Sequence, residues 1–255
     1  MGQIYDSAGL QNAPALLLVH GSVVTRKMWL PQLRDLSDSF RVIAPDLPGH
    51  GSLAHIPFSF EAAASKLSEL IREEAGGRAL VAGLSLGGYV AIELADRHPE
   101  QVAGLALSGC SLNFTGWMGP YLKFASGLMR RGWLKQSRAQ AEEKARRMIP
   151  SELPDVAEAV IRAGVYPEAL GPAFAEMAGV DFTLPLSRYP GPGLILNGER
   201  DRSSRRGEAK FAAAMQQGRV EVISDAGHAC NLDQPEAFNR AVREFGREIG
   251  WIMYQ

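Results

Sequence analysis

Short runs of apolar residues recur along the first part of the chain and are separated by polar or amphipathic segments. The runs at 15–19, 41–44, 79–82 and 102–108 show no alternation of apolar and polar side chains. A continuous apolar run of this length predicts a strand that is buried on both faces, as in a parallel sheet.

The segments between these runs have a helical pattern. Apolar residues lie three and four positions apart at 27–36 and 60–74, and the segment 89–95 also reads as a helix. Strand and helix therefore alternate. This order predicts a parallel sheet that is covered by helices on both faces.

The alternation stops at 112–187, which is helical or irregular and rich in Met, Phe, Trp and Arg. It resumes with predicted strands at 193–197 and 220–223 and with predicted helices at 206–216 and 235–249. We therefore predict an α/β fold with a mostly parallel central sheet. Its core domain would comprise residues 1–111 and 188–255, and residues 112–187 would form a helical lid inserted late in the sheet.

A serine between glycines follows the apolar run at 79–82, in Gly83-Leu84-Ser85-Leu86-Gly87-Gly88. A strand, a sharp turn with serine at its apex and a helix form the context that a G-x-S-x-G nucleophile elbow requires. The backbone comes close to itself in such a turn, so the flanking positions lack bulky side chains. The turn would also place the Leu86 N–H at a helix N-terminus, where it can stabilise an oxyanion.

A serine nucleophile needs a general base and a group that orients the base. Of the five histidines, only His228 follows both Ser85 and a candidate acid in the chain and lies directly after a predicted strand. We therefore predict His228 as the base.

The candidate acid is Asp201, which follows the predicted strand at 193–197. Glu199 and Asp225 are alternatives because both are close in sequence to the candidate groups. Since the carboxyl ends of parallel strands meet at one edge of a sheet, the serine, the acid and the histidine should converge there. The loop at 108–113 holds no carboxylate, and this favours Asp201.

A second oxyanion donor is expected in the loop that follows the first apolar run. There Gly21 allows close approach of the backbone, and the amide of Ser22, or of Val23, can pair with that of Leu86. We expect His20 to be a structural hydrogen-bonding residue rather than a second base.

Together, His20-Gly21, the segment Asp46 to Ser52, the Ser85 elbow, Gly198-Glu199-Arg200-Asp201 and Gly227-His228 resemble the α/β-hydrolase superfamily over residues 14–248. The resemblance implies that Ser85 attacks, His228 moves the proton and Asp201 orients the imidazole. Within the superfamily the pattern is similar to the cofactor-free group of carboxylesterases, enol-lactonases, carbon–carbon bond hydrolases and carrier-protein esterases.

From these residues we expect a serine hydrolase that cleaves a small or medium carboxylic ester or lactone through an acyl-enzyme, without metal or cofactor. One alternative is a carbon–carbon bond hydrolase acting on a diketone-type substrate. The other is a receptor with the hydrolase fold that binds a ligand with little turnover.

The predicted lid suggests substrate contacts. Trp117, Met118 and Tyr121 would form an apolar ceiling, with Val23 beside them, although packing on the core alone would also explain such residues. The segment 115–150 carries eight basic and two acidic residues. This charge suggests an acidic carrier protein or a coenzyme A ester as partner, and the alternative is pairing with the acidic second half of the lid.

Composition bears on the binding partners, the location and the cysteine chemistry to be expected. A net charge of −1 gives no indication of binding to nucleic acid or to an anionic membrane. The first residues have neither a basic nor an apolar signal region, so we expect a cytoplasmic protein. Cys110 and Cys230 form no metal or redox motif and are expected to be reduced and buried.

Overall fold

The computed structural model describes residues 3–132 and 137–253, and its centre is a sheet of seven strands in the order β1-β3-β2-β4-β5-β6-β7. All neighbouring pairs are parallel except β1 and β3. The strands are β1 Tyr5–Ala8, β2 Ala15–Val19, β3 Arg41–Pro45, β4 Ala79–Leu84, β5 Val102–Ser108, β6 Pro192–Gly198 and β7 Gln217–Ile223. The predicted fold class, an α/β-hydrolase fold with a mostly parallel sheet, is confirmed.

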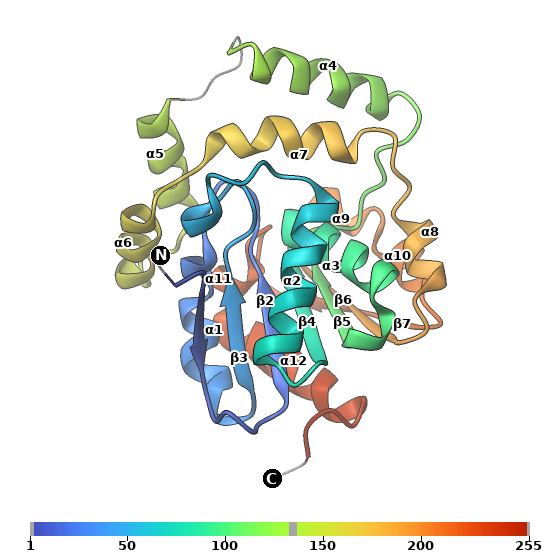
Figure 1. The fold of residues 1–255 in the computed structure, drawn as a ribbon. Coiled ribbons are helices and arrows are strands. Elements are labelled where there is room, and N and C mark those ends of the chain that lie inside the picture. Colours follow the sequence, from blue (N-terminus) through green and yellow to red (C-terminus); the bar gives the residue numbers. More distant parts are fainter. Residues whose placement is uncertain (1–2, 133–136, 254–255) are drawn as a thin grey trace.

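Helices lie on both faces of the sheet (Figure 1). The described helices are α1 Leu30–Asp35, α2 Phe60–Glu74, α3 Leu86–Arg97, α4 Met118–Arg130, α5 Arg138–Met148, α6 Pro154–Ala163, α7 Leu170–Met177, α8 Thr183–Arg188, α9 Arg202–Arg205, α10 Glu208–Ala214, α11 Cys230–Asp233 and α12 Pro235–Glu248. The helix expected at 60–74 coincides with α2. The one expected at 27–36 is divided into a 3-10 turn, α1 and a second 3-10 turn.

Alternate side chains of the central strands pack into two separate hydrophobic cores, one on each face of the sheet. In β2, Leu17 and Val19 pack into the core beneath α2, α3, α8 and α10. Leu16 and Leu18 point the opposite way, into the core beneath α1 and α12. All four side chains have no exposed surface. This double burial explains why the strands read as continuous apolar runs.

The first strand was not predicted. β1 runs antiparallel to β3, with Tyr5 opposite Pro45 and Ala8 opposite Val42. Its sequence Tyr-Asp-Ser-Ala lacks an apolar run because β1 lies at the edge of the sheet and its residues are half-buried or exposed.

The residues between β5 and β6 form five helices, α4 to α8, and no strand lies among the described residues there. In Figure 1, α4, α5 and α7 lie above the carboxyl ends of the strands, and α6 lies lower, at the edge of the sheet, where it packs against the 3-10 turn before α1. α8, in contrast, packs against α3 and α10 on one face of the sheet. We use "lid" below for α4–α7, and the division of the chain at residues 111 and 188 stays a prediction.

Candidate active site

Ser85 lies at the turn between β4 and α3, in a conformation that side-chain-bearing residues rarely adopt. Its φ and ψ angles are 54° and −118°, and it is one of three non-glycine residues with positive φ among those described. Such strain persists only where the surrounding structure enforces it, and it is common at functional sites. The expected turn between strand and helix is therefore present, with the serine at its apex.

The glycines of this turn are required by close backbone contacts. A Cβ atom at Gly83 would collide with the carbonyl of Gly87, and one at Gly87 would collide with the carbonyl of Val19 in β2. A Cβ at Gly88 would collide with the sulfur of Cys110. The first turn of α3 thus lies directly against two neighbouring strands, which sets the position of Ser85.

Asp201, directly after β6, is hydrogen-bonded to His228 in the loop after β7. Nδ1 of His228 lies 2.8 Å from Oδ2 of Asp201. The other carboxylate oxygen of Asp201 accepts from Ser203 Oγ at 2.6 Å and from Ser204 N–H at 3.2 Å. Burial alone would raise the pKa of Asp201, but these hydrogen bonds lower it well below its usual value, so the group is a carboxylate.

The two alternative acids lie elsewhere. Asp225 is exposed and forms an ion pair with Arg200. Glu199 accepts a hydrogen bond from the backbone N–H of Asp225 at 3.1 Å. Among the three candidate acids, the structure therefore brings Asp201 to His228.

A cleft of about 210 Å³ lies between the turn at Ser85 and the lid. Ser85 and His228 both line it, together with Ser22 and Leu86. The remaining wall is mostly apolar and includes Phe114, Leu122, Ala173, Phe174 and Met177. None of the described Lys and Arg residues lines this cleft, so it suits an uncharged, apolar group.

The structure separates the two proposed donors in the loop after β2. The Val23 N–H donates to Nε2 of His50 at 3.2 Å, so it is already used. The Ser22 N–H has no acceptor among the described residues, and Ser22 lines the cleft. The Leu86 N–H lies in the first turn of α3, where a helix offers no internal acceptor. Ser22 and Leu86 are thus the amides available at the cleft.

The buried side chains of His20 and His50 hold this loop through hydrogen bonds to backbone groups. Nε2 of His20 accepts from the Leu47 N–H at 3.0 Å, and its Nδ1 lies 2.7 Å from the Gly21 carbonyl. Nδ1 of His50 lies 3.0 Å from the Pro48 carbonyl. Burial lowers the pKa of both histidines, that of His50 to about 3 with a further contribution from His20. Both are therefore neutral, and each offers one acceptor nitrogen to the backbone.

Val23 itself has a strained backbone and a contact with the lid. Its φ angle is +73°, a value that is unusual for a β-branched residue. Its carbonyl accepts from the backbone N–H of Tyr166 at 2.7 Å. Val23 is therefore held by His50 on one side and by the segment after α6 on the other.

The predicted apolar ceiling is made by other residues. Trp117 and Tyr121 are 77% and 59% exposed, and neither they nor Met118 or Val23 are among the residues that line the cleft. The inner face of the lid contributes Leu122 and the α7 residues instead. The reason is that α4 is apolar on two faces, and a sequence pattern cannot tell which of the two faces inward.

A second, larger cavity of about 880 Å³ opens among α4, α5 and α7. It shares Leu170 and Phe174 with the cleft at Ser85, so the two spaces adjoin. Its lining includes the cations Arg130, Arg131 and Lys144 and a single acidic residue, Glu168.

Within the described ranges, no cluster of His, Cys, Asp and Glu has the arrangement of a metal site. Cys110 and Cys230 are buried and unpaired, and burial raises the pKa of both thiols, that of Cys230 to about 12. None of the described helices is both long and apolar enough to span a membrane.

The sequence is similar to a family of hydrolases and to individual esterases within it. The model of the alpha/beta hydrolase family matches residues 16–241. A pimeloyl-[acyl-carrier protein] methyl ester esterase of Aromatoleum aromaticum is 30% identical over 246 residues, which cover 88% of this chain and 95% of the relative. The protein of the same description from Neisseria meningitidis serogroup B is 31% identical over 244 residues, 89% and 91% of the two chains.

Solved structures agree with this placement. A thermophilic esterase from Thermogutta terrifontis is 30% identical, with a TM-score of 0.79 over 96% of this chain and 93% of that one. An enol-lactonase from Burkholderia xenovorans LB400 has a TM-score of 0.78 over 94% and 95% of the two chains. Its identity is 21%, so it shows similarity of fold alone.

Proposed function

The chain belongs to the alpha/beta hydrolase family, and we propose that it is a serine esterase whose nucleophile is Ser85. One observation carries the proposal. The strained Ser85 turn and the Asp201–His228 pair, from three different strand ends, lie at one cleft with two unpaired backbone amides. The esterase descriptions of the relatives support the same reaction class.

In the proposed acylation step, Ser85 Oγ attacks the ester carbonyl carbon while Nε2 of His228 accepts the hydroxyl proton. The Asp201 carboxylate holds Nδ1–H of the imidazole and stabilises the imidazolium that forms. His228 then gives the proton to the departing alcohol oxygen, which leaves an acyl group on Ser85.

The tetrahedral oxyanion would be stabilised by the Ser22 and Leu86 amides. Removing one such donor typically costs about 2.7–4 kcal/mol of transition-state stabilisation. Deacylation follows the same path in reverse order, with water as the nucleophile: His228 takes a proton from the water and returns it to Ser85.

The substrate class follows from the cleft. A space of about 210 Å³ with apolar walls and no cation fits a small or medium uncharged group on one side of the ester bond. A carboxylate at that end would be desolvated without a partner, which is costly. We therefore propose neutral carboxylic esters, with lactones as the cyclic form of the same substrate.

A partner is suggested by the adjoining cavity. Arg130, Arg131 and Lys144 line a space that shares the wall residues Leu170 and Phe174 with the cleft. A phosphate on the far part of a substrate, as in a coenzyme A ester or an acidic carrier protein, would meet these cations. Esters carried by an acyl carrier protein are also the substrates named for the relatives.

The proposal is tested with p-nitrophenyl esters of increasing acyl length. We expect hydrolysis by the wild type, with an optimum at short or medium chains, and a loss of about 10³-fold or more in kcat for Ser85→Ala. Ser187→Ala, at an exposed serine of α8, is the matched control and should keep full activity. Full activity of Ser85→Ala, or no activity of the wild type on any ester, would contradict the proposal.

A further inference from the structure

The outer face of the lid carries a stripe of exposed apolar side chains. Trp117, Tyr121 and Phe124 are 77%, 59% and 67% exposed, and Leu128 is half-buried. These residues are four, three and four positions apart, so they lie along one side of α4. We call these four residues the aromatic stripe.

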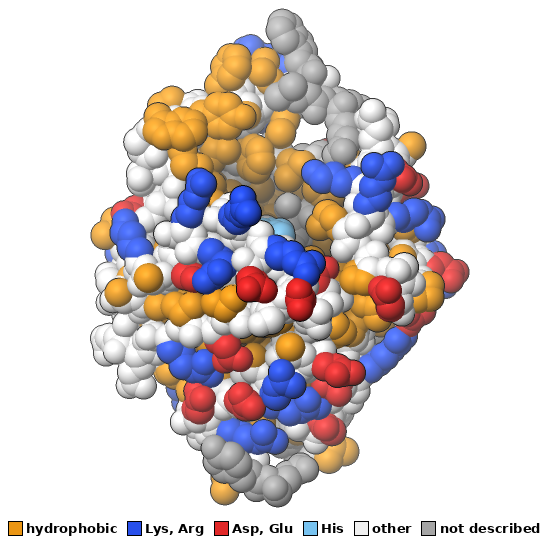
Figure 2. All heavy atoms as spheres, turned by 180° about the vertical axis from the view of Figure 1, so that it is seen from behind, with side chains coloured by type: hydrophobic (Ala, Val, Ile, Leu, Met, Phe, Trp, Pro, Cys, Tyr) orange, Lys and Arg blue, Asp and Glu red, His pale blue; other side chains and the backbone are white. Residues whose placement is uncertain are grey.

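The opposite side of α4 is already covered. Leu122 and Ala125 are buried, and α4 packs against α7. The helix therefore has two apolar faces, and among the described residues only the inner one is covered by another element. In the view from behind, hydrophobic side chains gather at the lid end of the molecule, whereas cations and anions are mixed over the lower part (Figure 2).

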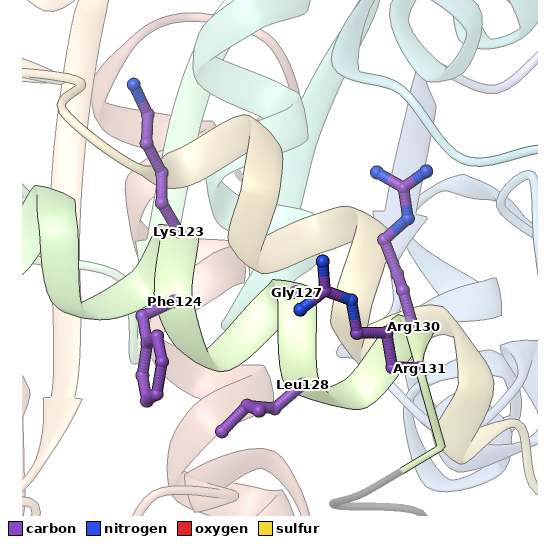
Figure 3. Close-up of a pocket in the computed structure, with 6 residues that line it drawn as sticks. All are labelled: Lys123, Phe124, Gly127, Leu128, Arg130 and Arg131. Atoms are coloured by element: carbon purple, nitrogen blue, oxygen red, sulfur yellow. The ribbon is translucent and has the colours of Figure 1, made fainter.

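Cations lie beside the aromatic stripe. Lys123, Phe124, Leu128, Arg130 and Arg131 surround a surface depression of about 550 Å³ that has Gly127 in its wall. Figure 3 shows Lys123 and Arg130 extending to one side of α4, Phe124 and Leu128 extending to the other, and Arg131 lying across the helix near Gly127. The depression thus has a cationic edge and an apolar edge.

Lys123, Arg130 and Arg131 form no ion pair with a described carboxylate, although Glu168 lines the adjoining cavity with the two arginines. The sequence contains no Asp or Glu between Glu100 and Glu142. Arg138 pairs with Glu142, but no carboxylate of the described residues pairs with Lys123, Arg130 or Arg131. A helix of this composition presents uncompensated positive charge together with aromatic side chains.

We propose that this face of α4 docks on an anionic lipid surface. Aromatic side chains suit the boundary between headgroups and acyl chains, and Lys and Arg beside them pair with lipid phosphates. An acidic protein would satisfy the cations but not the length of the aromatic stripe. The net charge of −1 led us to expect no membrane contact. The proposal departs from that expectation, because net charge does not report how charge is distributed over the surface.

The docking would place the cleft next to the lipid. Leu122, on the inner side of α4, lines the cleft at Ser85, so the helix that carries the proposed lipid face also contributes to the wall of the cleft. An ester dissolved in the lipid would then be concentrated near the cleft. The docking itself does not depend on the reaction, and it is measured on a variant without the proposed nucleophile.

The test is co-sedimentation of the Ser85→Ala protein with vesicles of phosphatidylcholine alone or mixed with phosphatidylglycerol. We expect binding to the mixed vesicles that weakens as salt is added, and little binding to phosphatidylcholine alone. Tyr121→Ala with Phe124→Ala should weaken vesicle binding about tenfold or more. Lys123→Glu with Arg131→Glu should abolish the preference for phosphatidylglycerol.

Two control variants test whether vesicle binding depends on α4 in particular or on exposed apolar and charged residues in general. Leu184→Ala removes an exposed apolar side chain of α8, and Arg240→Glu reverses an exposed charge of α12. Both should bind vesicles like the parent protein. Circular dichroism checks that every variant is folded.

Three results would overturn the proposal. The first is equal binding of the parent and the Tyr121→Ala/Phe124→Ala variant to the mixed vesicles, or no binding by either. The second is a dimer in size-exclusion chromatography that this double variant dissociates, since the stripe would then be a subunit interface. The third is saturable binding of a purified acidic carrier protein that requires the stripe, without vesicle binding.

Discussion

Gly109, the residue after β5, lies directly against the imidazole of His228. A Cβ atom at position 109 would approach Cε1 of the ring to 2.8 Å. The Gly109 N–H donates to Oδ1 of the buried Asn197 at 3.0 Å, which fixes the loop at this distance. Gly109 thus supports the face of the imidazole, while Asp201 holds its edge.

Replacing Gly109 by alanine should therefore displace His228. A shift of about 1 Å at a catalytic group costs about 10²-fold in kcat. The positive φ of 62° adds a stability cost of about 1 kcal/mol. Gly76→Ala is the matched control, because Gly76 has a φ of 63° and no neighbouring atom near its Cβ position. Thermal melting of Gly76→Ala measures the backbone cost alone, and only Gly109→Ala should lose esterase activity. Equal activities would show that the ring tolerates the contact.

Asp201→Asn should lower kcat by about 10⁴-fold, because an amide stabilises the wrong imidazole tautomer and no imidazolium. Asp225→Asn changes a nearby exposed carboxylate that pairs with Arg200, and it should stay within about twofold of the wild type. Steady-state kinetics on one p-nitrophenyl ester compares the two. A large loss in Asp225→Asn with a small one in Asp201→Asn would reassign the acid.

Phe114→Ala should lengthen the acyl chain that the protein accepts. The ring of Phe114 packs edge-on against Tyr89 and Phe182 and forms part of the cleft wall. Removing it opens apolar space, and each additional methylene that fits can gain about tenfold in kcat/KM. The ratio of kcat/KM for long and short esters measures the change. Leu184→Ala, at an exposed site, should leave that ratio unchanged.

Acid should destabilise the protein through the two buried histidines. Above pH 6.5 both are neutral in the folded and unfolded chains and contribute no pH dependence. As the pH falls from 6.5 towards 3, the unfolded chain binds a proton that folded His50 cannot take up, because burial lowers its pKa to about 3. Each such proton reduces the free energy of unfolding by about 1.4 kcal/mol per pH unit.

The measurement is the free energy of unfolding in urea at several pH values between about 4 and 6. In His50→Gln the slope of this free energy against pH should fall by about 1.4 kcal/mol per pH unit, which is the contribution of one proton. This change does not depend on the absolute stability of the variant. An unchanged slope would mean that His50 is protonated in the folded chain. In that case Nε2 could not accept the Val23 N–H.

Much of the architecture could be predicted because strong local patterns specify it. The strands β2, β4, β5 and β6 are buried on both faces and so read as apolar runs. The Ser85 elbow was found because close packing allows only glycine at three neighbouring positions. The pairing of Asp201 with His228 followed from the rule that parallel strands end at one edge.

Other features depend on contacts that no local pattern encodes. The Val23 N–H is occupied by His50, which lies 27 residues beyond Val23, and this contact leads us to propose Ser22 rather than Val23 as the donor. The apolar residues of α4 occur on two faces, so Trp117 and Leu122 could not be distinguished from the sequence. Val23 shows no sign of strain in the sequence, because tertiary contacts with His50 and Tyr166 impose its positive φ.

The connection between β5 and β6 can change in sequence and length during evolution without altering the sheet. The two strands pair directly in parallel, and α8 is the part of their connection that packs against a face of the sheet. Helices α4–α7 are an extension of this single crossover, while Ser85, Asp201 and His228 belong to loops after β4, β6 and β7. Insertions, deletions and replacements in the extension can thus change which substrates fit the cleft without disturbing strand register. Proteins that descend from one ancestor can therefore differ in substrate while they keep the same residues at the strand ends.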